Sequence, residues 1–446
     1  MKRTHKGTFQ ESSTRTERAQ PEPLSGEKTI YESIASTFSD FFSLLGGSSD
    51  VLRQSLTAIM LSIATDVFAG VLLHGAEETL ALLPGLIVLV PAAIGMRGNI
   101  FSSMGSRLGS ALHLGAVDRL SLDDRTVKNN IYAPLSLSII FSVLSAFIAK
   151  AVLLLAGFPS ISVFSLVLIS FIGGMISSIL LLIITFGISF QSYRRGWDPD
   201  NLTSPMLSGL GDLFTIPALL IAAEFVIGLG GRTQIAEVFV LSIFILSVLF
   251  FFKAGMSREA VAGSYRGIVL QSAPVIAVGL LLDSFAGLFI HIKFENFATL
   301  GFLIVMLPAF LEEGGNIGTI LASRLGTKLH LGTLDPELTI SKEIKKEFFN
   351  SYFLAMVIFP VVAVASYFTA RILSIPVLPL AQAVYISVFA GLALTTLIII
   401  LSFSISVISY KHNLDPDNVT IPLITSTADL VGAFSLLATA SLFGII

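Results

Sequence analysis

The chain has 446 residues, of which 54% are apolar and 13% charged, and its formal net charge is −3. Because soluble domains carry about 25% charged residues, this composition excludes an ordinary soluble domain. The small net charge gives no reason to expect a nucleic-acid partner. The absence of cysteine excludes disulfides and thiolate metal sites.

The first residues, 1–50, are polar and carry charges of both signs, which is typical of a cytoplasmic tail. Long apolar stretches follow, and many reach the ~20 residues that cross a bilayer core. They predict eleven helices, at about residues 51–73, 79–97, 130–157, 160–190, 204–229, 236–253, 268–290, 296–313, 348–375, 377–409 and 421–446. We therefore predict an all-α polytopic membrane protein in contact with the lipid bilayer.

An internal repeat places equivalent residues 217 positions apart. Residues 91–115 read PAAIGMRGNIFSSMGSRLGSALHLG and residues 308–332 read PAFLEEGGNIGTILASRLGTKLHLG, so that 13 of 25 positions are identical. The same spacing relates Asp212 to Asp429. A constant offset of this kind predicts two copies of one structural unit.

The segment between the copies predicts their relative orientation. A unit of five spans begins and ends on opposite sides of the membrane, so one extra span within residues 231–267 returns the second unit to the orientation of the first. We therefore predict parallel repeats, at residues 51–230 and 268–446, with a pore on a pseudo-two-fold axis along the membrane normal. The loops on one side hold most lysines and arginines, and those on the other hold only Arg232 and Lys293. This bias predicts a cytoplasmic N-terminus and an outside C-terminus in the plasma (inner) membrane.

Two motifs recur in both copies. Arg-Gly-Asn or Gly-Gly-Asn is followed by Ser-Arg-Leu, and Asp-Pro-Asp-Asn precedes a helix with a single aspartate. Together they resemble the MgtE and solute carrier family 41 magnesium transporters over roughly residues 50–446. The resemblance implies Mg²⁺ as the transported ion rather than a catalytic cofactor, and a central cation site made by a pair of acids. The tandem form implies one pore from two repeats, for which no oligomer is required.

Asp212 and Asp429 are the strongest site candidates. An acid at the centre of a membrane helix costs about 2.5–3.5 kcal/mol on insertion scales, so it normally faces a cavity or a partner. We expect the two carboxylates to face each other and bind one mostly hydrated Mg²⁺, with carbonyls of Ser208 and Thr425 completing the site. The alternative is two buried or protonated acids, or acids paired with Arg97 or another base.

Asn99 and Asn316 follow glycines in a segment where proline and glycine weaken the helix. Either their side-chain carbonyls line the ion path, or Gly-Asn forms a turn or a helix cap. The repeats differ beside these residues, and we expect a salt bridge between Arg97 and Glu312 or Glu313.

Asp66 and Asp283 lie at matching depths in the first helix of each copy. They are candidates for a coupling-ion or secondary-ion site, or for acids held by buried hydrogen bonds. The leading function is a Mg²⁺ channel or transporter, and the alternative is a Na⁺- or H⁺-coupled Mg²⁺ exchanger. Walker, HExxH and GxSxG motifs are absent from the sequence. An intramembrane metal-dependent enzyme is a weaker alternative, because such sites usually recruit histidine and the predicted spans hold no histidine cluster. We expect no enzymatic activity.

Overall fold

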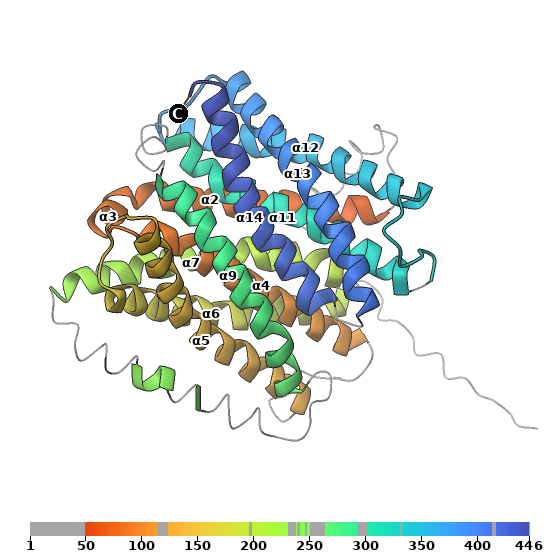
Figure 1. The fold of residues 1–446 in the computed structure, drawn as a ribbon, viewed down its shortest axis with the longest axis horizontal. Coiled ribbons are helices and arrows are strands. Elements are labelled where there is room, and N and C mark those ends of the chain that lie inside the picture. Colours follow the sequence, from red (N-terminus) through yellow and green to blue (C-terminus); the bar gives the residue numbers. More distant parts are fainter. Residues whose placement is uncertain are drawn as a thin grey trace, which may run out of the picture. The chain divides into compact units, whose positions relative to one another are not determined.

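Helices make up most of the described part of the chain, which comprises residues 50–113, 124–195, 199–230, 264–292, 301–330, 332–412 and 416–445, with short pieces at 238, 241–245 and 248–249. In the computed structural model they are α2 (Asp50–Gly75), α3 (Glu77–Leu82), α4 (Leu86–His113), α5 (Arg125–Leu155), α6 (Val163–Arg195), α7 (Pro199–Gly228), α9 (Tyr265–Ile292), α11 (Gly301–His330), α12 (Lys342–Ile372), α13 (Leu380–Lys411) and α14 (Pro416–Leu442). No strand occurs among the described residues, so the predicted all-α class is confirmed there (Figure 1). The predicted tail, 1–50, and connecting helix, 236–253, lie almost entirely outside the described residues.

Nine of the described helices are long and apolar enough to cross a membrane, namely α4 to α7, α9 and α11 to α14. The apolar part of α2 that was searched, Ile59–Gly75, is shorter. The structure thus has the long apolar helices of a polytopic membrane protein. The count of eleven spans stays a prediction.

Each long helix of the first repeat has a counterpart in the second, and local start signals recur with it. Asp124 precedes α5, and its side chain accepts hydrogen bonds from the backbone nitrogens of Thr126 (2.6 Å) and Val127 (3.2 Å). Ser341, 217 positions later, precedes α12 and accepts one from the nitrogen of Ile344 (3.3 Å). These N-caps satisfy backbone donors that have no partner inside the helix.

The two repeats interlock through their first helices. Helix α2 packs against α11 of the other repeat, and α9 packs against α4; Figure 1 shows α9 alongside α14. Glycine allows both crossings. A Cβ on Gly70 would overlap the backbone carbonyl of Val305, and one on Gly287 would lie 2.6 Å from the carbonyl oxygen of Val88. Such close helix approach through small residues is common in membranes.

Helices α4 and α11 are longer than predicted. They run on through Asn99 and Asn316, so the turn or cap, one of the two alternatives for these residues, is wrong. The beginning of the predicted helix 79–97 instead forms the short helix α3. The proline inside each long helix removes an internal hydrogen bond, and each glycine costs about 1 kcal/mol relative to alanine. Almost every residue along these segments is buried, so packing against neighbouring helices offsets these local costs.

The C-terminal halves of α4 and α11 are anchored to the next helix by side-chain contacts. In the second repeat, Glu347 of α12 pairs with Arg324 Nε (2.9 Å) and Lys328 Nζ (2.6 Å). In the first repeat, Arg107 Nε donates to Asn130 Oδ1 of α5 (3.1 Å). Arg107 and Asn130 are the repeat equivalents of Arg324 and Glu347, so the same anchor exists in a charged and a neutral form.

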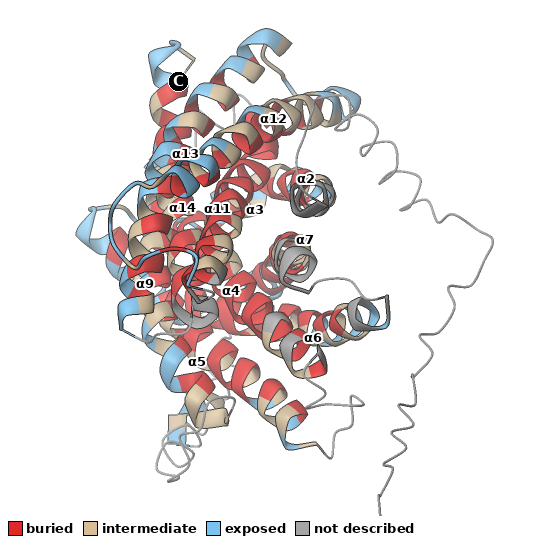
Figure 2. Cartoon of the chain, turned by 90° about the vertical axis from the view of Figure 1, so that its right-hand side faces the viewer, coloured by how far each residue is buried: buried red, intermediate tan, exposed pale blue. Residues whose placement is uncertain are grey.

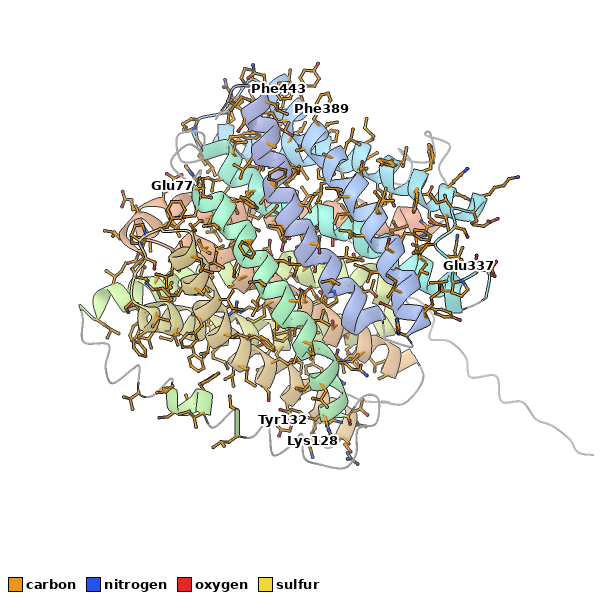
Figure 3. All side chains as sticks on the ribbon, viewed as in Figure 1. Glu77, Lys128, Tyr132, Glu337, Phe389 and Phe443 are labelled. Carbon is orange, nitrogen blue, oxygen red and sulfur yellow. The ribbon has the colours of Figure 1, made fainter. Side chains whose placement is uncertain are left out.

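Polar groups gather inside the helix bundle, and apolar ones cover much of its outside. Figure 2 shows buried residues concentrated where α4, α9, α11 and α14 meet. Large apolar side chains such as Ile183 and Phe225 are exposed. The charged residues Glu77, Lys128 and Glu337, labelled in Figure 3, lie at helix starts or in a connecting segment. This distribution is the one expected of helices surrounded by lipid.

Candidate functional site

A cavity with about 620 Å³ of empty space lies between the repeats, and its wall comes from α2, α4, α7, α9, α11 and α14. Seven pairs of residues on this wall are equivalent by the offset of 217. They include Ser208 with Thr425 and Asp212 with Asp429. The cavity is therefore built from the same positions of both repeats.

Asp212 and Asp429 both lie on the cavity wall, on α7 and α14. Asp212 is 3% exposed, and its side chain lines the same cavity as that of Asp429. Ser208 and Thr425 precede them by four residues, which places each pair on one face of its helix. The structure thus brings together the four residues proposed from sequence for the centre of the site.

The two asparagines have different surroundings. Asn99 lies on the cavity wall, where its Oδ1 accepts a hydrogen bond from the hydroxyl of Thr425 (2.7 Å). Asn316 is not on this wall, and its Nδ2 donates to Oε2 of Glu313 (3.1 Å). Only Asn99 is therefore placed to reach an ion in this cavity.

Glu312 is a cavity residue that sequence reasoning treated only as a salt-bridge partner. It lies on the same wall as the equivalent residue Gly95, and its Oε1 is buried without a hydrogen-bond partner among the described residues. Ser208 is beside it. The sequence signal available was a pair of adjacent acids, Glu312 and Glu313, inside an apolar span. Adjacent residues of a helix point in different directions, so the sequence did not show which of the two faces the cavity.

The expected salt bridge between Arg97 and Glu312 or Glu313 is wrong for the described residues. The guanidinium of Arg97 instead donates to the carbonyl of Ala93, to Ser142 Oγ (3.2 Å) and to the carbonyl of Ser170 (3.5 Å). Two small residues, Ser142 and Gly174, make room for it between α5 and α6. In the second repeat the equivalent space beside Gly391 is filled by the ring of Phe359.

Asp66 and Asp283 are fully buried but do not lie on the cavity wall. Asp66 accepts hydrogen bonds from Ser62 Oγ (3.0 Å) and Thr65 Oγ1 (3.4 Å). Neither carboxylate oxygen of Asp283 has a hydrogen-bond partner among the described residues. A Cβ added to Gly95 would lie 2.6 Å from Oδ2 of Asp283 and 3.3 Å from Oδ2 of Asp429. Asp283 therefore lies directly behind the cavity wall.

The acids do not converge as ligands of a bare metal ion. Within the described part of the chain, no group of three His, Asp or Glu side chains is placed to hold a metal between them. The wall instead offers separated carboxylates together with hydroxyl and amide groups. Such spacing suits an ion that keeps its own water, because the waters bridge the remaining distance.

Comparisons with known proteins support a transport role along both repeats. The family described as "MgtE: Divalent cation transporter" matches residues 90–222 and 307–439, which are again 217 positions apart. Solute carrier family 41 member 3 of Rattus norvegicus is 23% identical over 377 residues, or 79% of this chain and 78% of the relative. Solute carrier family 41 member 2 is 25% identical in Gallus gallus, over 86% of this chain and 69% of the relative. The same member in Xenopus laevis is 26% identical over 69% of this chain, which spans only 56% of that relative. No solved structure matches the chain.

Proposed function

This chain belongs to the MgtE family of divalent cation transporters, and on that premise we propose that it carries Mg²⁺ across a lipid bilayer through the cavity between its repeats. The observation that carries the proposal is the equivalent pair Asp212 and Asp429 on the wall of one cavity. Acids inside a membrane normally face a cavity, an ion path or a partner. The family is one of transporters, and we propose no enzymatic role.

Mg²⁺ gives up its water reluctantly and usually keeps several water ligands in proteins. Asp212 and Asp429 would accept hydrogen bonds from the water ligands. Asn99, Ser208 and Thr425 would bind further waters from the same wall.

Charge balance also favours a divalent ion at this place. Two carboxylates in a low-dielectric interior repel each other and are costly to bury without a cation. One Mg²⁺ close to Asp212 and Asp429 would neutralise the charges of this pair. The attraction of the two carboxylates for the ion in turn offsets part of the hydration free energy that the ion loses when it leaves bulk water.

A coupled exchanger is the second candidate function, and the surroundings of Asp283 favour it. Asp283 is buried behind the cavity wall, and neither of its oxygens has a hydrogen-bond partner among the described residues. A proton or Na⁺ bound at Asp283, or at its equivalent Asp66, would change the charge beside the ion cavity. Mg²⁺ flux measured with and without an imposed pH or Na⁺ gradient separates an exchanger from a channel.

The test of the main proposal is Mg²⁺ flux into liposomes that hold the purified full chain. Each single variant, Asp212→Asn or Asp429→Asn, removes one of two charges and should weaken flux. The double variant should abolish it, because both matched carboxylates that stabilise the ion are then neutral. Glu337→Gln removes an exposed acid outside the helices and serves as the control. Flux of the double variant equal to that of the control would refute the proposed site.

A further inference from the structure

The cavity wall departs from two-fold symmetry at one position. Helix α11 contributes Glu312, whereas α4 contributes Gly95 at the equivalent place. Asp283 lies against Gly95, so no second glutamate fits there without displacing it. The wall therefore carries three carboxylates, of which Glu312 and Asp429 come from the second repeat and Asp212 from the first.

Glu312 has no cationic partner among the described side chains. Its Oε1 is buried without a hydrogen bond, and none of the described ion pairs includes it. The other charged residues on the cavity wall are the carboxylates of Asp212 and Asp429. Arg97 is the base nearest to the position of Glu312 when the two repeats are aligned. Its guanidinium donates hydrogen bonds to Ser142 of α5 and to Ser170 of α6 instead.

A carboxylate held in this environment needs a counter-charge, because an unpaired charge is costly to bury. The protein offers no such charge near Glu312 within its described residues. The transported cation in the cavity is the remaining source of positive charge. The position of Glu312 on the cavity wall, rather than behind it, allows contact with the water ligands of that ion.

We propose that Glu312 is a third ion-binding carboxylate, which holds the cation on the α11 side of the cavity rather than on the pseudo-two-fold axis. This inference rests on the proposed function and adds a residue from one repeat only. Three negative charges exceed the charge of one divalent ion. The affinity of the site should consequently rise steeply with the charge of the ion. A trivalent ion of similar hydrated size should therefore bind more tightly than Mg²⁺.

The experiment compares Glu312→Gln with Glu313→Gln in the purified full chain reconstituted in liposomes. Both variants remove one charge from adjacent positions of α11, but Glu313 is not on the cavity wall. One readout is the Mg²⁺ concentration that gives half-maximal flux. The other is the concentration of hexaamminecobalt(III), whose ligands do not exchange, that blocks half of the flux.

We expect Glu312→Gln to weaken Mg²⁺ binding about tenfold to a hundredfold, as for loss of a hydrogen bond to a charged group. Coulomb energy is proportional to ion charge. The logarithm of the fold-loss in affinity for the trivalent ion should therefore be about 1.5 times that for Mg²⁺. Glu313→Gln should cause a smaller loss for both ions. Equal losses in the two variants, or no loss in Glu312→Gln, would overturn the proposal.

Size-exclusion elution and thermal midpoint check that each variant folds. If Glu312→Gln does not fold, Glu312→Asp keeps the charge one methylene farther from the ion, and wild-type affinities for both ions would then overturn the proposal. The double variant of Asp212 and Asp429 separates the two levels of inference. If it loses flux while Glu312→Gln keeps wild-type affinities, only the third carboxylate is refuted. If it transports Mg²⁺ like the wild type, the proposed function itself fails.

Discussion

Replacing Gly287 with alanine tests the interlock between the two repeats. An added Cβ would lie 2.6 Å from the carbonyl oxygen of Val88 and 2.8 Å from its Cα. Both are backbone atoms of α4, which cannot rotate away as the end of a side chain can. Helices α9 and α4 must therefore move apart until the shortest distance reaches the 3.4 Å of ordinary contact.

The size of the effect follows from two opposing terms. Overpacking typically costs 1–3 kcal/mol, and we expect about 3 kcal/mol because the obstacle is backbone. Alanine is the better helix former by about 1 kcal/mol, so Gly287→Ala should lower the free energy of unfolding by about 2 kcal/mol. Gly187 of α6 is the matched control, since nothing lies within 4 Å of a Cβ there. Gly187→Ala should raise the free energy of unfolding by up to about 1 kcal/mol.

The measurement is the free energy of unfolding of the purified chain in micelles, from titration with a denaturing detergent. Gly70→Ala repeats the test at the equivalent crossing of α2 and α11, where the added Cβ would meet the backbone of Val305. If Gly287→Ala and Gly70→Ala are both as stable as Gly187→Ala, the close approach of the repeats and the reasoning from it are wrong.

Two further predictions concern the ion path and the membrane topology. Asn99→Leu should lower Mg²⁺ flux because Asn99 lies on the cavity wall, whereas Asn316→Leu should lower it less because Asn316 contacts Glu313 instead; equal flux in the two variants would contradict this difference. The chain has no native cysteine, so Lys128→Cys and Lys345→Cys, which are exposed and equivalent positions, can each be labelled alone. A membrane-impermeant thiol reagent should modify both from the cytoplasmic face, and labelling from opposite faces would exclude parallel repeats.

The fold class and the matched acids could be predicted from sequence because both signals are local or periodic. A bilayer requires long apolar helices wherever the chain crosses it, so composition and segment length indicate an all-α membrane protein. The repeat offset of 217 relates Asp212 to Asp429 without any knowledge of packing. Both residues lie on one cavity because equivalent helices of the two repeats meet around it.

The remaining features depended on which helix each side chain meets. Successive residues of a helix point about 100° apart, so neither Glu312 nor Glu313 reveals from sequence which of them faces the cavity. The direction of the Arg97 side chain depended on the space that Ser142 and Gly174 leave, and both residues are far from it in the chain. The equivalent residues of the second repeat are Phe359 and Gly391, and the ring of Phe359 fills that space. Tertiary packing, through the volume available beside each helix, decided that the second repeat contributes an additional acid to the cavity while the first repeat's arginine lies elsewhere.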